Sequence, residues 1–198
     1  MGNLKRLIIM GLLVLFITGC SVFTIKNKHI EYLSGKHYVE MSITKYGKIE
    51  LELDADKAPI TVTNFMNLVR NGSYDNNKIH RVDKDFVIQG GEIQDAETIK
   101  GEFLANGVDN DISHVRGVIS MARAGDASEG YDTASSQFFI VTQDHTELDN
   151  YYAAFGKVTK GMDVVDKINK EVTKVGAYGS ITNESDMPVI EYIKEIEK

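Results

Sequence analysis

The stretch that decides the fold runs from Tyr74 to Gly91 and reads YDNNKIHRVDKDFVIQGG. Its second half is a short apolar run bounded by turn residues, and this pattern predicts a buried β-strand over Asp85–Gln89. The pair Gly90-Gly91 lacks the following Lys-Ser/Thr of a phosphate-binding loop, so we interpret it as a place of close backbone packing. Two similar apolar runs, Gly117–Ala122 and Gln137–Thr142, predict further buried strands.

The residues before this stretch predict a hairpin and a helix. Apolar and polar residues alternate strictly on both sides of Tyr46-Gly47, which is typical of an antiparallel hairpin with one buried face. The apolar members are Val39, Met41, Ile43, Ile49, Leu51 and Leu53. Pro59 then suits a first helical position, and apolar residues at helical spacing follow it as far as Asn71-Gly72.

The residues after the deciding stretch complete the pattern of a mainly β domain. Gly161–Asn169 has apolar residues at helical spacing and predicts a second helix. Val189–Ile196 fits a strand that returns to pair near the start of the domain, although its composition is ambiguous. Many short strands with two helices favour a closed antiparallel barrel, which has no exposed strand edges. The pattern alone fits a sandwich equally well.

Several motifs resemble the cyclophilins, the cyclosporin-binding peptidyl-prolyl isomerases. The stretch Tyr74–Gly91 resembles the family signature, and three later blocks follow in the family order. These blocks are Gly117–Ala124, Ser135–Ile140, and the pair Leu148-Asp149 with Ala153–Val158. The resemblance covers roughly Tyr38–Ile196. It implies a closed eight-stranded antiparallel β-barrel capped by two α-helices.

The chemistry of an Xaa-Pro bond explains which residues such an enzyme needs. Amide resonance holds the bond planar, with a rotation barrier of about 18–20 kcal/mol. A twisted amide regains a nitrogen lone pair, which accepts a hydrogen bond, and arginine is always charged and presents rigid donors. An apolar pocket seats the proline ring and removes water. This reaction requires no nucleophile, metal or cofactor, and none is expected here.

The resemblance assigns roles to residues of this chain. It implies that Arg81 is the catalytic donor and that Gln89 holds the substrate carbonyl. The proline pocket would be lined by Phe86, Val87, Phe139 and Leu148 and closed at one end by Tyr152; Ala122 and Arg123 would pair with the peptide backbone, and Gln137 would support the groove. Only one of Phe138 and Phe139 should face the pocket, because neighbouring residues of a strand alternate. We interpret His80 as a hydrogen-bonded framework residue, since the reaction transfers no proton.

Some positions depart from the family pattern. Glu147 and Tyr152 stand where eukaryotic members have Trp and His, and the chain has no tryptophan. Val87 replaces a methionine, and Asp83 replaces an apolar residue. The loss of the indole at position 147 predicts weak cyclosporin binding.

The amino terminus has the anatomy of an export signal. Lys5 and Arg6 precede Leu7–Ile17, an apolar run too short for the roughly 20 residues of a bilayer span. Ile17-Thr18-Gly19-Cys20 resembles the lipobox of bacterial lipoproteins, in which the cysteine is lipidated. We therefore expect a signal peptide over residues 1–19, a lipidated Cys20 with a tether to residue 36, and an isomerase domain over residues 37–198. The alternative interpretation of Cys20, the single cysteine, is a buried apolar residue.

Charge and motif content restrict the partners. The net charge of −7 disfavours binding to nucleic acid or to anionic lipid surfaces. The five histidines include no His-Glu-x-x-His pair, so no metal site is expected. The sequence thus predicts an extracytoplasmic isomerase that is held by lipid on the outer face of the bacterial cell membrane and acts on proline-containing exported polypeptides. Two alternatives remain open: a peptide-binding chaperone or receptor on the same scaffold, and a lipoprotein with an unrelated barrel.

Overall fold

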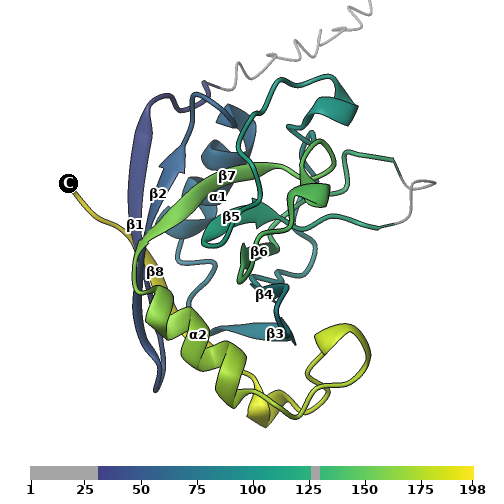
Figure 1. The fold of residues 1–198 in the computed structure, drawn as a ribbon. Coiled ribbons are helices and arrows are strands. Elements are labelled where there is room, and N and C mark those ends of the chain that lie inside the picture. Colours follow the sequence, from purple (N-terminus) through teal and green to yellow (C-terminus); the bar gives the residue numbers. More distant parts are fainter. Residues whose placement is uncertain (1–30, 126–129) are drawn as a thin grey trace, which may run out of the picture. The chain divides into compact units, whose positions relative to one another are not determined.

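Eight antiparallel strands close into a barrel in the order β1-β2-β7-β5-β6-β4-β3-β8 (Figure 1). The computed structural model describes residues 31–125 and 130–198. The strands are β1 (Lys36–Ile43), β2 (Gly47–Asp54), β3 (Asn77–Asp83), β4 (Val87–Gly90), β5 (Val118–Met121), β6 (Phe138–Val141), β7 (Ala154–Lys160) and β8 (Val189–Glu195). Closure pairs every strand on both sides, so the predicted barrel is confirmed and a sandwich is excluded.

The predicted hairpin forms in the register that its alternation requires. Val39 of β1 lies opposite Leu51 of β2, and Met41 lies opposite Ile49. All four side chains are buried inside the barrel. Strand β8 pairs with β1, which confirms the expected return of the chain to its start.

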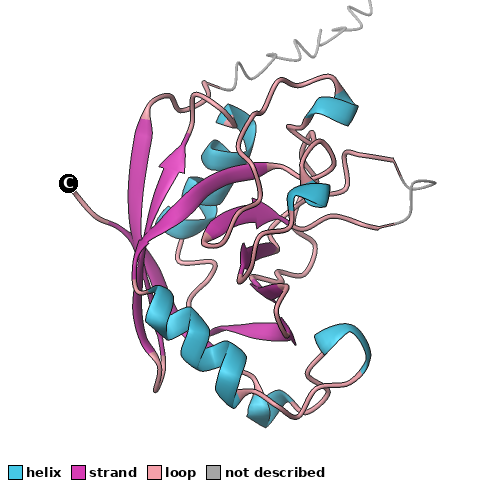
Figure 2. Cartoon of the chain, in the orientation of Figure 1, coloured by secondary structure: helices cyan, strands magenta, loops and turns pink. Residues whose placement is uncertain are grey.

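Two helices, α1 (Pro59–Arg70) and α2 (Met162–Glu171), lie at opposite ends of the barrel (Figures 1 and 2). Pro59 occupies the first turn of α1, as predicted. Phe65 of α1 enters the core, where its ring centre lies 5.2 Å from those of Tyr74 and Phe155 and 5.7 Å from that of Phe138. The apolar face of each helix therefore packs against the core formed by the alternating apolar residues of the strands.

The sequence patterns did not predict strands β3 and β7, and β4 begins later than predicted. Strand β3 has an irregular register between Ile79 and Arg81, and β7 has a comparable shift against β2, so neither shows a clean alternation. The strand expected from Asp85 begins at Val87, because Asp85 has a φ of 60° and lies in the turn that links β3 to β4. The strands predicted over Gly117–Ala122 and Gln137–Thr142 are each shorter by one residue at both ends, and the strand predicted over Val189–Ile196 ends one residue earlier.

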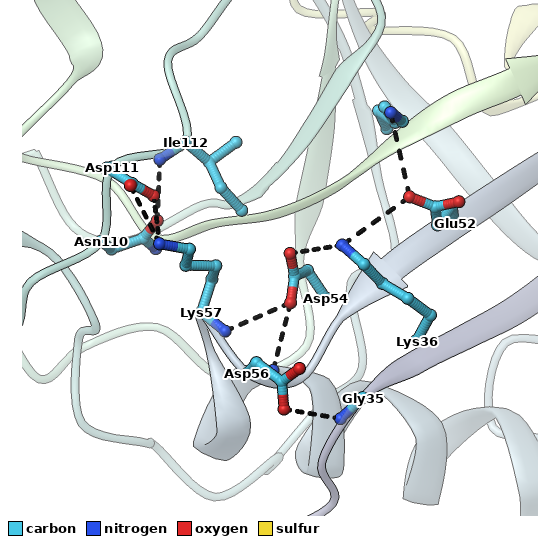
Figure 3. A network of polar contacts seen from close by, with 10 residues as sticks. Gly35, Lys36, Glu52, Asp54, Asp56, Lys57, Asn110, Asp111 and Ile112 are labelled. Atoms are coloured by element: carbon cyan, nitrogen blue, oxygen red, sulfur yellow. Dashed lines mark hydrogen bonds and ion pairs between the residues drawn. The ribbon is translucent and has the colours of Figure 1, made fainter.

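The folded unit begins before the expected domain boundary at residue 37. It spans Glu31–Lys198, and the Leu33 N–H donates a hydrogen bond of 2.8 Å to the Thr63 hydroxyl of α1. Figure 3 shows Lys36 between Glu52 and Asp54, while the Gly35 N–H donates to Asp56 at 2.7 Å. Residues 31–36 therefore belong to the fold and not to a tether.

The predicted signal peptide, Cys20 and the rest of the tether lie outside the described residues. Within the described ranges, no helix has the length and apolar character needed to cross a membrane.

Candidate active site

One side of the barrel carries an apolar cluster on its outer surface, separate from the main core. Its buried members are Val87, Val118, Phe139, Val141 and Ala154, which come from strands β4 to β7. Phe138 points the opposite way, into the barrel, where its ring lies edge-on to Tyr74. The prediction that only one residue of this pair faces the pocket is confirmed.

A cavity of about 340 Å³ opens above this cluster. It is lined by Arg81, Phe86, Val87, Gln89, Ala122, Arg123, Gly125, Phe139, Leu148 and Tyr152. Every residue that the resemblance assigned to substrate lies here except Gln137, and Gly125 is an addition. Gln137 lines an adjoining cavity of about 230 Å³, which shares Gln89, Ala122 and Arg123 with the first. The two cavities together form a groove, in which the first cavity has an apolar floor and the second is lined mainly by polar side chains.

Arg81 lies at the edge of the apolar cavity and is held by its neighbours. The strand register places it opposite Gln89, whose Oε1 accepts a hydrogen bond of 3.1 Å from Arg81 Nη1. Gln89 in turn donates to Gln137 Oε1 at 2.9 Å. The guanidinium carbon lies 5.3 Å from the centre of the Phe86 ring. The charged Arg81 guanidinium thus lies directly beside the apolar floor of the cavity.

Arg123 occupies the boundary between the two cavities. Its guanidinium lies 4.8 Å from the ring centre of Tyr152, 5.3 Å from that of Tyr131 and 5.5 Å from that of Phe103. Arg123 Nε also donates to the Tyr151 carbonyl at 2.8 Å. These contacts fix the side chain, so that the end of the groove near Tyr152 has a rigid wall.

His114 is a supporting residue that sequence analysis missed. It is fully buried, and its ring stacks on Phe139 with the ring centres 6.1 Å apart. Nδ1 lies 2.7 Å from Asp149 Oδ1 and Nε2 lies 3.0 Å from Ser120 Oγ. A carboxylate accepts only, so neutral His114 donates from Nδ1 and accepts from Ser120 at Nε2. Burial lowers the pKa of His114, against the opposing effect of Asp149, and this favours the neutral form.

The rim of the cavity carries a second histidine, His145, paired with Glu147. His145 Nδ1 lies 2.5 Å from Glu147 Oε1, and the His145 ring lies edge-on to Phe86 with the ring centres 4.7 Å apart. The hydrogen bond raises the pKa of His145 and lowers the pKa of Glu147. The position where the family has an indole therefore holds a carboxylate bound to a neighbour.

His80 faces away from the apolar cavity, as expected for a strand neighbour of Arg81. It lines another cavity with residues that include Lys78 and Glu92. Burial lowers its pKa, and its Nδ1 has no hydrogen-bond partner among the described residues. A hydrogen bond between the His80 side chain and Gln137 opposes the effect of burial on this pKa, and the His80 carbonyl accepts from the Ile181 N–H at 2.9 Å.

A closed eight-stranded barrel with two helices and an arginine at an outer cavity is the arrangement that the resemblance to cyclophilin-type prolyl isomerases implies. The model of the family "Cyclophilin type peptidyl-prolyl cis-trans isomerase/CLD" matches residues 38–193. The chain belongs to this family and is a peptidyl-prolyl cis-trans isomerase.

Bacterial relatives are similar over most of their length. Peptidyl-prolyl cis-trans isomerase A of Dickeya dadantii is 41% identical over 163 residues, which cover 78% of this chain and 83% of the relative. A peptidyl-prolyl cis-trans isomerase of Acinetobacter baylyi is 42% identical, with 76% of this chain and 80% of the relative covered. Peptidyl-prolyl cis-trans isomerase B of Escherichia coli is 37% identical, with 66% and 83% covered.

Solved structures show the same fold. The crystal structure of a Cryptosporidium parvum cyclophilin-type isomerase has a TM-score of 0.70 at 24% identity and covers 83% of this chain and 99% of that one. The structure of the same protein in the presence of the dipeptide Ala-Pro has a TM-score of 0.67.

Proposed function

We propose that this isomerase acts on exported polypeptides while a lipid on Cys20 holds it at the outer face of the bacterial cell membrane. The support comes from the N-terminal sequence: a basic start, an apolar run of eleven residues and a lipobox-like tetrapeptide that ends at Cys20. Two or more acyl chains anchor stably where one is marginal. Slow proline steps limit the folding of exported chains, and this enzyme would accelerate them.

Within the site, we assign the catalytic hydrogen bond to Arg81. The observation that carries this assignment is the placement of the guanidinium at the edge of the apolar cavity, beside Phe86 and Gln89. The cavity takes the proline ring, and Arg81 donates to the amide nitrogen as the bond twists. The Ala122 N–H already donates to the Gln137 carbonyl at 2.9 Å, so a bound peptide would pair with the other backbone groups near Arg123.

Exchange spectroscopy on an Xaa-Pro peptide tests the role of Arg81. A hydrogen bond to a charged group contributes about 1.5–3 kcal/mol, so Arg81→Ala should slow catalysed exchange roughly ten- to a hundredfold and leave peptide binding intact. Arg116→Ala is the matched control, because Arg116 also bonds one carbonyl and one carboxylate, those of Thr142 and Asp166, away from the cavity. Full activity in Arg81→Ala would remove Arg81 from the mechanism.

A peptide-binding chaperone or receptor is the second candidate function. The observations that favour it are the changes around the proline pocket, where Val87, Glu147 and Tyr152 depart from the family pattern. This candidate predicts binding shifts in the peptide spectrum without accelerated exchange in the unaltered chain. Accelerated exchange would exclude it as the main role.

Metabolic labelling tests the anchor. The bacteria express the full chain and are fed an alkyne fatty acid. We expect the protein to carry the label and to be found in the membrane fraction. Cys20→Ser should lose both signals, and externally added protease should degrade the unaltered protein on cells stripped of any outer barrier. Equal labelling of Cys20→Ser, or an unlabelled parent chain, would contradict the proposal.

A further inference from the structure

We propose that Asp83 is a positioning residue, which orients the Arg81 guanidinium for catalysis together with the backbone carbonyl of Tyr178. This inference rests on the proposed role of Arg81. It concerns a position where this chain carries a carboxylate and the family signature carries an apolar residue.

Strand geometry brings Asp83 to Arg81. Residues two apart on a strand share a face, so both side chains of β3 project on the side of the cavity. Their partners on β4 are Gln89 and Val87, and both of these line the cavity. Asp83 Oδ2 lies 2.6 Å from Arg81 Nη2. About a quarter of each side chain is exposed, which places the ion pair at the rim of the cavity.

Three acceptors hold the three nitrogens of the guanidinium. Nη1 donates to Gln89, Nη2 donates to Asp83, and Nε donates to the Tyr178 carbonyl at 2.7 Å. Arginine has five N–H donors, so one remains on each terminal nitrogen. Because the three bonds prevent rotation of the planar group, the two remaining donors have fixed directions beside the Phe86 ring.

The Tyr178 carbonyl reaches Arg81 through an unusual loop. Tyr178 lies in the short helix η4 (Ala177–Gly179), has a φ of 56° and exposes 86% of its surface, so the contact uses its backbone. Gly179 is pressed against β3: a Cβ there would lie 2.5 Å from the Val82 carbonyl oxygen and 2.6 Å from Asp83 Cα. The loop is thus fixed to the strand that carries both Arg81 and Asp83.

Fixed donors matter because the transition state is short-lived and its nitrogen lone pair has one direction. A flexible arginine must lose side-chain freedom at that moment, whereas a guanidinium already held by Asp83 and Tyr178 does not. Asp83 should therefore affect turnover more than substrate binding. It acts through Arg81 and does not itself touch the proline.

The test compares Asp83→Ala, Asp83→Asn and the control Asp166→Ala in the full chain, purified in a non-ionic detergent. Asp166 pairs with Arg116 at 2.7 Å, so its removal breaks an equivalent ion pair away from the cavity. From peptide exchange at several peptide concentrations, we expect Asp83→Ala to lower kcat roughly tenfold with KM within about twofold. Asp83→Asn keeps an oxygen acceptor and should retain at least about a third of kcat, and Asp166→Ala should match the parent.

Two further measurements separate positioning from a purely structural effect. Asp83→Ala should cause no additional loss in the Arg81→Ala background, because the two residues act as one unit. In arginine-labelled protein, the Arg81 Nη signals should be resolved in the parent and merge in Asp83→Ala as rotation is released. A variant that is only less stable would change neither the double-mutant comparison nor the separation of the Arg81 Nη signals.

Several outcomes would overturn the inference. These are an unchanged or faster kcat in Asp83→Ala, an equally deep loss in Asp83→Asn, or an equal further loss in the Arg81→Ala background. A faster enzyme would mean that Asp83 competes with substrate for Nη2. If Arg81→Ala is inactive but Asp83→Ala is not impaired, only this inference fails, whereas a fully active Arg81→Ala defeats the proposed role of Arg81 itself.

Discussion

At the scale of single residues, Glu147 is the departure from the family pattern from which we predict weak cyclosporin binding. Its side chain is 68% exposed and is bound to His145, beside Phe86. An indole at this place would add an apolar surface and an N–H donor, as the resemblance implies for cyclosporin binding. The carboxylate supplies neither.

We therefore predict weak inhibition by cyclosporin and a gain on substitution. Glu147→Trp should lower the inhibitory concentration roughly five- to thirtyfold, since a partly buried indole contributes on the order of 1–2 kcal/mol. Inhibition of peptide exchange measures this, with Glu97→Trp at another exposed acidic position as the control. Nanomolar inhibition of the unaltered chain would show the prediction to be wrong.

The residues of the site differ in how far the sequence reveals them. Arg81, Phe86 and Gln89 lie in one continuous motif, so a resemblance locates all three. Asp83 was identified in this motif as a departure from the family pattern. Its pairing with Arg81 was not predicted, because it depends on the strand geometry of β3. His114 lies 35 residues from Asp149 in sequence and carries no local signal.

At the scale of elements, helix α1 takes its N-terminal cap from a distant loop. Ala58 at the N-cap position makes no side-chain cap. Instead the buried carboxylate of Glu102 accepts hydrogen bonds from the Ile60 N–H at 3.0 Å and the Thr61 N–H at 2.7 Å. A negative charge at this end also complements the helix dipole.

Removal of this cap should destabilise the domain. We expect Glu102→Ala to lower the free energy of unfolding by about 2–3 kcal/mol, because two hydrogen bonds to a carboxylate are lost and the Thr61 N–H stays buried. For a chain of this length, the melting temperature should fall by roughly 4–12 °C. Thermal unfolding followed by circular dichroism measures the effect. Exposed Glu97→Ala is the control, and equal stability of the two variants would refute the capping role.

At the scale of the whole molecule, residues that precede the first strand attach the start of the domain to the rest of the fold. Leu33 packs against the main core and donates to Thr63, and the Gly35 carbonyl accepts from Ala55 N–H at 2.9 Å. These contacts join the start of the domain to β2 and to α1, far along the chain from the catalytic stretch.

Two truncations test how much this segment contributes. A chain that begins at residue 37 should be less stable than one that begins at residue 31 by at least about 2 kcal/mol, from the partial burial of Leu33 and the three hydrogen bonds that Leu33 and Gly35 make. Urea unfolding of the two proteins measures the difference, which should appear in the midpoint and not in the slope. Superimposable unfolding curves would show that residues 31–36 add nothing to the fold.

Local pattern was enough to predict most of this molecule. Strict alternation identified the β1–β2 hairpin, helical spacing identified α1 and α2, and one continuous motif located Arg81, Phe86 and Gln89. These features depend on residues that are close together in the chain, so they can be predicted from the sequence. The choice of barrel over sandwich, the strands β3 and β7, and the contacts of Asp83 and Glu102 depend on pairings between distant segments. Chain closure brings those segments together, and no local pattern encodes their contacts.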